Sequence, residues 1–157
     1  MRIFLVNKQK ICHINSVKLK KLAHSFLLQL ARLTPDVSYG DLSFILMDDA
    51  GITELNLDYL DHAFATDVLT FPYLHNSLTG QIIDAEIIVN IQRALAEGPK
   101  HGGASRELAL YMAHGCDHLS GLNDDTLNGM HQMRIRELNW LRNARKANLT
   151  TSLLITS

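Results

Sequence analysis

Short runs rich in β-branched and aromatic residues alternate along the chain with longer stretches in which apolar residues recur at helical spacing. The short runs predict four β-strands, at residues 2–7, 41–47, 68–71 and 82–89. Pro72 is expected to end the third strand, because proline cannot donate a backbone hydrogen bond to a sheet. The turn-forming residues 75–80 are expected to separate the third strand from the fourth.

The stretches with helical spacing predict about five helices. In chain order we expect a helix that Ser16 caps, one from Asp48 or Asp49 to about Leu60, and three at residues 90–97, 104–120 and 125–146. The apolar stripe of the first helix consists of Val17, Leu19, Leu22, Phe26, Leu27 and Leu30. Candidate core positions of the last helix are Leu127, Met130, Met133, Ile135, Leu138 and Leu141. Mixed strands and helices predict an α+β fold.

The length of 157 residues and the hydrophobic content of 46% fit one compact domain with a real core. We expect that domain over residues 1–147, followed by a tail, 148–157, that either packs on the domain or is disordered. Only two cysteines, no basic and apolar leader, and no apolar run long enough to span a membrane predict a reduced, cytoplasmic protein with no membrane partner. A net charge of −1 argues against a global basic field, although a locally basic groove stays compatible with RNA binding.

The most specific chemistry lies in the segment from His114 to Asp124. His114 and His118 are four residues apart, so on a helix they lie about 40° apart around the axis and both can reach one ion. Gly121 tolerates positive φ, so it can turn the chain back and let Asp124 approach the same point. Two imidazoles and a carboxylate with an open fourth position are typical of catalytic zinc, although nickel, copper and iron suit the same donors.

The residue after the first histidine argues against a peptidase. Metalloproteases of the His-Glu-x-x-His type use the glutamate as general base, and this chain has Gly115 in that position. We expect the small residue to leave room near the ion.

Several ordered motifs make the chain resemble the YbeY family of bacterial ribosomal-RNA maturation factors. They are ILMDD (45–49) before LN (55–56), ATDVLTFPY (65–73), AEI (85–87), REL (106–108) and HGxxHLxG (114–121). The resemblance implies a mixed four-stranded sheet, and a zinc ion held by the two histidines and a third ligand beyond the glycine. It also implies endoribonuclease activity that prefers single-stranded RNA, with roles in small-subunit rRNA maturation and ribosome quality control.

Two departures from the family pattern bear on the metal ligands. The commonest pattern has a third histidine where this chain has Asp124, but carboxylates bind zinc at similar distances, so Asp124 remains the expected ligand. Asp125 and His131 are the alternatives. Asp117 occupies a position at which the family prefers an apolar residue. There it is expected to orient a ligand imidazole or to accept a proton as a catalytic residue, unless it is a solvated surface charge.

A third departure bears on substrate binding. Leu60 stands where the family has an arginine thought to contact phosphate, and His62 is a candidate replacement if it faces the cleft. Thr66 and Asp67 are candidate substrate contacts, or else they brace the start of a strand. Exposed aromatic residues at 71 and 73 would stack on single-stranded bases, with core packing as the alternative for residue 71.

Basic residues offer a possible phosphate track, with solvated helix faces as the alternative: Lys18, Lys20, Lys21, Arg134, Arg136, Arg142, Arg145 and Lys146. The sequence thus predicts a zinc-dependent endoribonuclease in which His114, His118 and Asp124 hold the ion and His114 and Asp117 are catalytic. Its expected partners are single-stranded or ribosomal RNA and the ribosome or its small subunit. The alternatives are a ribosome-associated assembly factor with a structural metal and little or no nuclease activity, and a metal hydrolase of small molecules or peptides.

Overall fold

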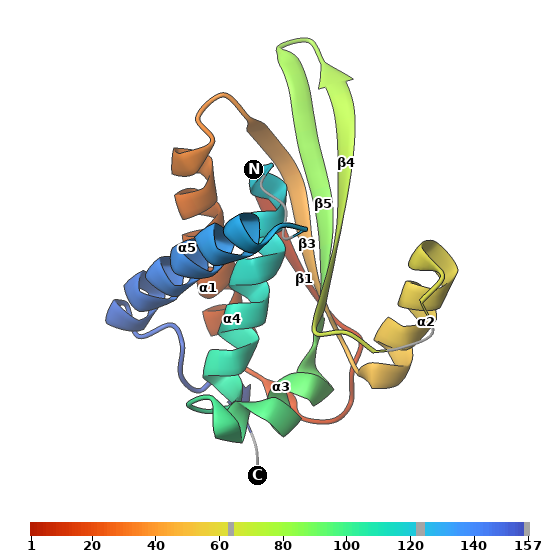
Figure 1. The fold of residues 1–157 in the computed structure, drawn as a ribbon, viewed down its shortest axis with the longest axis vertical. Coiled ribbons are helices and arrows are strands. Elements are labelled where there is room, and N and C mark those ends of the chain that lie inside the picture. The colour runs from red at the N-terminus through yellow and green to blue at the C-terminus, as the bar shows by residue number, and fades with distance from the viewer. Residues whose placement is uncertain (63–64, 122–124, 156–157) are drawn as a thin grey trace.

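The structure is a computed structural model that describes residues 1–62, 65–121 and 125–155 (Figure 1). Its strands are β1 (Arg2–Asn7), β2 (His13–Ile14), β3 (Ser38–Met47), β4 (Val68–Ser77), β5 (Gly80–Asn90) and β6 (Leu154–Ile155). Its helices are α1 (Ser16–Leu33), α2 (Asp49–Leu60), α3 (Ile91–Glu97), α4 (Ala104–Asp117) and α5 (Leu127–Lys146). Two short 3₁₀ turns follow α3 and α4, η1 (Gly98–Lys100) and η2 (His118–Ser120). The expected α+β class is therefore confirmed.

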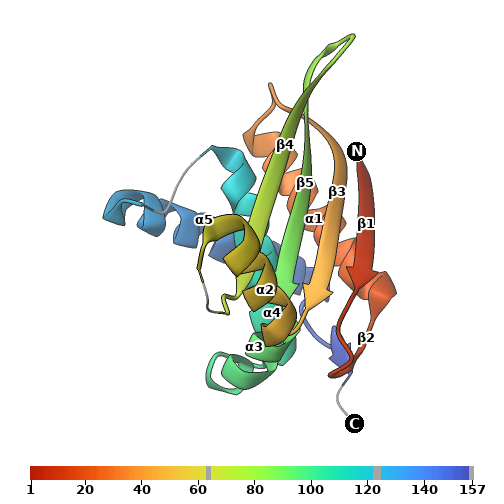
Figure 2. The same ribbon diagram turned by 90° about the vertical axis from the view of Figure 1, so that its right-hand side faces the viewer.

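The central sheet has four strands in the order β1-β3-β5-β4. β1, β3 and β5 run parallel, and β4 pairs antiparallel with β5 at one edge, so the expected mixed sheet is also confirmed. Helices α1 and α4 lie on one face of this sheet and α2 lies on the other (Figure 2). The β4–β5 hairpin extends beyond the remaining elements.

The two sides of the sheet carry cores of unequal size because strand residues alternate between the faces. Phe44 of β3 joins the larger core under α1 and α4, together with Phe26 and Met112. Its neighbour Ile45 packs on the other side, against a small cluster that Ile52 of α2 forms with residues of β4 and β5. The edge strand β4 therefore presents one set of side chains to α4 and another to α2.

The first helix follows the sequence prediction closely. The apolar stripe is buried at five of the six expected positions, and Val17 alone among the six is exposed. The cap is one residue earlier than expected, because the side chain of Asn15 accepts a hydrogen bond from the Lys18 N–H over 3.1 Å. Asp48 caps α2 as expected, accepting from the Gly51 N–H over 2.8 Å.

The third predicted strand is too short in the sequence analysis. β4 continues through Pro72 to Ser77, and Pro72 pairs with Ala85. An edge strand tolerates proline because one of its sides has no hydrogen-bonding neighbour. The expected turn at 75–80 shrinks accordingly, since the strands are paired up to Ser77 and Gly80.

The predicted core face of α5 is largely wrong. Met133 and Leu141 are buried as expected, but four other positions are exposed, namely Leu127, Met130, Ile135 and Leu138. The buried residues of this helix are Gly129, Met133, Glu137, Trp140, Leu141 and Ala144. An apolar-only stripe missed this face because a carboxylate, Glu137, lies in the middle of it.

The C-terminal segment packs on the domain as far as the structure describes it. Leu153 is fully buried in the main core, and its backbone accepts a hydrogen bond from the Asn15 N–H. Leu154 pairs with Ile14 in the small β2–β6 sheet, and the hydroxyl of Ser105 accepts from the backbone N–H groups of both leucines. Of the two alternatives for the tail, the structure therefore shows packing for residues 148–155.

Helix α4 comes unusually close to the sheet at Gly115. A Cβ built there would lie 2.6 Å from Ile87 Cγ2 and 2.9 Å from Val68 Cγ2, both of which are closer than real contacts allow. The Thr70 hydroxyl donates to the Gly115 carbonyl oxygen over 2.9 Å, which holds the helix against β4. The small residue therefore makes room for the sheet, and room near an ion stays a prediction.

We predict that Gly115→Ala lowers the free energy of unfolding by about 1–3 kcal/mol, because the added methyl group overpacks the helix–sheet contact. The measurement is urea unfolding of metal-free protein, with Gly51→Ala as the control. Residue 51 is also a helical glycine, but its added Cβ would come no closer than 3.2 Å to a neighbour. Equal stability of Gly115→Ala and wild type would show that the contact is loose.

Candidate functional site

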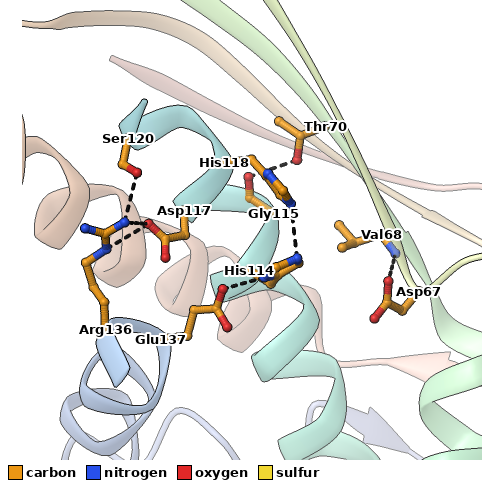
Figure 3. Close-up of polar contacts among 10 residues, drawn as sticks. All are labelled: Asp67, Val68, Thr70, His114, Gly115, Asp117, His118, Ser120, Arg136 and Glu137. Carbon is orange, nitrogen blue, oxygen red and sulfur yellow. Dashed lines mark hydrogen bonds and ion pairs between the residues drawn. The ribbon is translucent and has the colours of Figure 1, made fainter. Parts of the chain in front are cut away.

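His114 and His118 converge at the C-terminal end of α4. Their Nε2 atoms lie 3.0 Å apart, and the ring planes stand at 78° to each other (Figure 3). His114 is on the last turn of α4 and His118 begins the 3₁₀ turn η2, so the expected continuous helix tightens between them. Both imidazoles are half-buried and reach solvent. The sequence prediction that the two rings face one point is confirmed.

Glu137 of α5 fixes the orientation of the first ring. Its carboxylate contacts Nδ1 of His114 and is almost fully buried. A buried carboxylate accepts hydrogen bonds, so the proton of a neutral His114 is assigned to Nδ1 and Nε2 keeps its lone pair. This arrangement, with a carboxylate behind a histidine whose other nitrogen is available, is typical of metal-binding histidines.

The two Nε2 atoms suit a shared ion. Two nitrogen ligands about 2.0–2.1 Å from a tetrahedral zinc lie about 3.3 Å apart, so a shift of a few tenths of an ångström would seat both. Among the described residues, no group of three histidine, cysteine or acidic side chains is placed to hold a metal. Asp124, the expected third ligand, lies outside the described residues. Gly121 has a φ of 88°, so the expected left-handed turn at this residue is confirmed.

Asp117 points away from the histidine pair. Its carboxylate is fully buried, where it contacts both Nε (2.8 Å) and a terminal nitrogen of the Arg136 guanidinium. The same guanidinium donates to Ser120 Oγ over 2.9 Å. Burial raises the pKa of the Asp117 carboxyl, and Arg136 opposes that shift. Asp117 is therefore not a solvated surface charge, and the role of orienting an imidazole belongs to Glu137 instead.

Cys116, which lies between the two histidines in the sequence, is a buried and unreactive thiol. Cys116 is fully buried in the main core, and burial raises the pKa of its thiol. Cys116 and Cys12 are both free cysteines in the structure.

Thr66 and Asp67 brace the start of β4. The Asp67 carboxylate accepts from the Val68 N–H over 2.8 Å, and its backbone carbonyl accepts from the Asn90 N–H. The Asn90 amide donates to the Thr66 carbonyl over 3.0 Å and to Asp49 over 2.7 Å. The bracing interpretation of these two residues is thus what the contacts show, and a substrate contact stays a prediction.

Leu60 and His62 lie at the C-terminal end of α2. Leu60 is the last residue of α2, which packs on the sheet face opposite α4 (Figure 2). His62 follows Asp61, a left-handed cap residue with φ 55°, and its side chain is exposed. A substrate contact by His62 therefore stays a prediction.

The basic residues do not form one track beside the histidines. Arg136 is engaged by Asp117, and the Lys18 ammonium donates to the Thr151 backbone carbonyl over 2.5 Å. Arg142 and Arg145 line a hollow with Arg106, at the opposite end of α4 from the histidines. A phosphate track along the predicted helices is therefore not supported by these contacts.

Sequence reasoning missed Glu137, and a signal for it existed. Glu137 is four residues after Met133 and four before Leu141. The sequence pattern correctly predicted that Met133 and Leu141 are buried. An acidic residue in the buried stripe of a helix requires a partner. The partner, His114, lies 23 residues away in the sequence. The sequence pattern could not identify it, because the contact depends on how α5 packs on α4.

Comparison with known proteins places this geometry in a family. A family model described as Endoribonuclease YbeY matches residues 4–145. The chain belongs to this family. The histidine pair, its buried carboxylate and the sheet contact at Gly115 thus all lie within the part of the chain that the family model matches.

Individual relatives support the assignment. Proteins named Endoribonuclease YbeY from Amoebophilus asiaticus and Thermodesulfovibrio yellowstonii are 34% and 30% identical over 69% and 77% of this chain, and over 73% and 82% of their own lengths. One from Cytophaga hutchinsonii is 33% identical over 62% of this chain, and that match spans 66% of the relative, just under two thirds. A Thermotoga maritima protein solved in solution has the same fold, with a TM-score of 0.60, 22% identity, and coverage of 94% of this chain and 93% of its own.

No helix in the described part of the chain is both long and apolar enough to cross a bilayer.

We predict that Arg136→Met lowers the free energy of unfolding by about 3–5 kcal/mol, because it leaves the Asp117 carboxylate buried without its charge partner. The double variant Asp117→Leu/Arg136→Met should recover most of this loss. Urea unfolding is the measurement.

The matched control is Arg2→Met, which removes one partner of the exposed Arg2–Asp41 pair. That change should leave the free energy of unfolding close to that of wild type, since solvent screens exposed ion pairs. Similar losses in Arg136→Met and Arg2→Met would contradict the buried-pair interpretation.

Proposed function

We propose that this protein is a zinc-dependent endoribonuclease that prefers single-stranded RNA and acts in the cytoplasm on ribosomal RNA, in its maturation and in ribosome quality control. The observation that carries the proposal is the convergence of the His114 and His118 Nε2 atoms, with Glu137 behind the first ring. Membership of a family whose relatives are named endoribonucleases supports the reaction class. The ribosome or its small subunit is the proposed partner.

The residues present fit a zinc site. His114, His118 and Asp124 would hold the ion, and it would supply an acidified water and positive charge at the scissile phosphodiester. Glu137 keeps the His114 proton on Nδ1, which leaves Nε2 available as a ligand. The Asp117–Arg136 pair holds α5 against the end of α4, and so positions Glu137 without contacting the imidazoles.

The packing at residue 115 supports a substrate other than peptides. In His-Glu-x-x-His peptidases this position carries the catalytic glutamate. Here Gly115 faces Ile87 and Val68 of the sheet, so a glutamate would meet the core and could not reach the histidine side of the helix. The catalytic glutamate of a His-Glu-x-x-His peptidase is therefore absent here, which argues against that class of peptidase.

The second candidate function is a ribosome-associated factor in which the metal is structural and nuclease activity is low or absent. Leu60, in place of the family arginine, favours it, because this position at the end of α2 lacks the charge thought to contact phosphate. The separation of Arg106, Arg142 and Arg145 from the histidines points the same way.

We predict that zinc-loaded protein cleaves single-stranded RNA and that His114→Ala or chelation of zinc abolishes cleavage. The measurement is cleavage of a labelled single-stranded oligoribonucleotide. A double-stranded RNA of the same sequence serves as the comparison substrate. Sedimentation with the small ribosomal subunit that survives both treatments, together with uncleaved RNA, would favour the assembly-factor alternative.

We predict that Asp124→Ala lowers zinc affinity sharply and that Asp125→Ala leaves it unchanged, because only Asp124 is the proposed ligand. Competition against a chelating dye measures the affinity. Equal zinc affinities of wild type and Asp124→Ala would remove Asp124 from the site. Elemental analysis of the purified protein identifies the metal it carries.

We predict that Glu137→Gln lowers zinc affinity by about 10- to 100-fold, because the neutral amide holds the His114 N–H less strongly. Glu107→Gln is the control. Glu107 is also a buried carboxylate contacting a histidine, but that histidine is His101, 3.1 Å away, outside the proposed site. An unchanged zinc affinity in Glu137→Gln would reduce Glu137 to a purely structural residue.

A further inference from the structure

A cavity lies on the α2 side of the sheet, away from the histidines. It has a volume of about 160 Å³, roughly five times the ~30 Å³ that a water molecule occupies in the liquid. Three aromatic residues line it, Tyr59 from α2 and Phe71 and Tyr73 from β4, above a floor of aliphatic side chains. Tyr59 and Phe71 pack with ring centroids 5.6 Å apart. The cavity is therefore a small aromatic pocket that opens on the surface.

The aromatic side chains remain accessible. Tyr59 is 69% exposed and Tyr73 is 52% exposed, whereas Phe71 is half-buried against the small core. Phe71 thus packs on the small core, which was the alternative expected for it, whereas Tyr73 is exposed and its stacking on a base stays a prediction. Exposed rings next to a fixed ring are suited to stacking on a planar partner.

Two charged groups at the pocket have no ion pair or hydrogen bond within the described part of the chain. They are the half-buried carboxylate of Glu86 on β5 and the ammonium group of Lys8, which follows β1. The side-chain contacts of the neighbouring carboxylate Asp84, in contrast, are taken by His75 and by the backbone of β3. The pocket therefore offers an acceptor and a donor of opposite charge beside aromatic walls.

The pocket and the histidine pair lie on opposite sides of one edge strand. Thr70 bonds to the backbone of α4 between the two histidines, and Phe71, the next residue of β4, lines the pocket. Among the described residues, no strand pairs with the outer side of β4 in the central sheet. A flexible single strand that reaches the histidines therefore needs only to pass over this edge to reach the pocket.

We propose that this pocket binds an unpaired guanine base of the RNA substrate. Guanine has two adjacent N–H groups that can donate hydrogen bonds to a carboxylate. It also has a carbonyl oxygen that can accept a hydrogen bond from an ammonium group. Glu86 and Lys8 fill these two roles while Tyr73 and Tyr59 stack on the base. This assignment rests on the proposed RNA substrate, and it adds a specificity subsite outside the metal site.

The test is the affinity of metal-free protein for a fluorescent oligouridine that carries one central guanine, compared with the same strand carrying adenine. Wild type should bind the guanine strand more tightly. Tyr73→Ala should weaken binding about tenfold or more through lost stacking. Glu86→Gln should abolish the preference for guanine over adenine, and inosine, which lacks the exocyclic amine, should bind between the two.

Leu74→Ala is the matched control, since Leu74 is the next residue of the same exposed strand and does not line the pocket. It should bind both strands as wild type does. Equal binding of guanine and adenine strands by wild type, or unchanged binding by Tyr73→Ala, would overturn the proposal. Unchanged RNA binding with loss of small-subunit sedimentation in Tyr73→Ala would assign the pocket to a protein partner and overturn it too.

Cleavage assays separate this proposal from the proposed function. If zinc-loaded protein cleaves oligouridine in a manner that depends on His114 but shows no preference for guanine, the nuclease assignment stands and the base pocket fails. If guanine is preferred through Glu86 and no RNA is cleaved, the pocket stands and the nuclease assignment fails.

Discussion

The contact between α4 and the edge of the sheet at Gly115 is the constraint on which the site depends. With no side chain at this position, the helix backbone approaches β4 closely enough for Thr70 to bond to it. When Gly115 faces the sheet, the 3.6-residue period of α4 fixes the directions in which the neighbouring side chains point. His114 and His118 then emerge where solvent reaches them, and Asp117 is turned into the protein.

Helix α5 completes the arrangement with two consecutive residues. Arg136 contacts the buried Asp117, and Glu137 contacts His114, so both partners on α4 are held from one turn of a neighbouring helix. Buried polar contacts of this kind allow few alternative registers, because a slipped helix would leave charged groups without partners. The stability of the α4–α5 contact and the orientation of the imidazole are therefore coupled.

The edge strand β4 gives the molecule two chemically distinct faces. Alternation along the strand sends Thr70 toward the histidine-bearing helix and Phe71 toward α2. Leu60, where the family has an arginine, also belongs to the α2 side. On that side aromatic side chains line a pocket together with Glu86, which forms no ion pair among the described residues, and on the other side the imidazoles converge. The strand between them is the edge of the sheet as far as the described residues show.

The amino-acid sequence by itself determined the four strands of the central sheet, the five α-helices, the α+β class and the convergence of His114 and His118. These follow from local rules, since period and spacing act within a few residues. The tertiary structure alone decided the buried face of α5, the partner of Glu137 and the burial of Asp117. It also carried β4 past Pro72, because that strand lies at an edge. Each of these depends on which surface covers a residue, and segments distant in the sequence supply that surface.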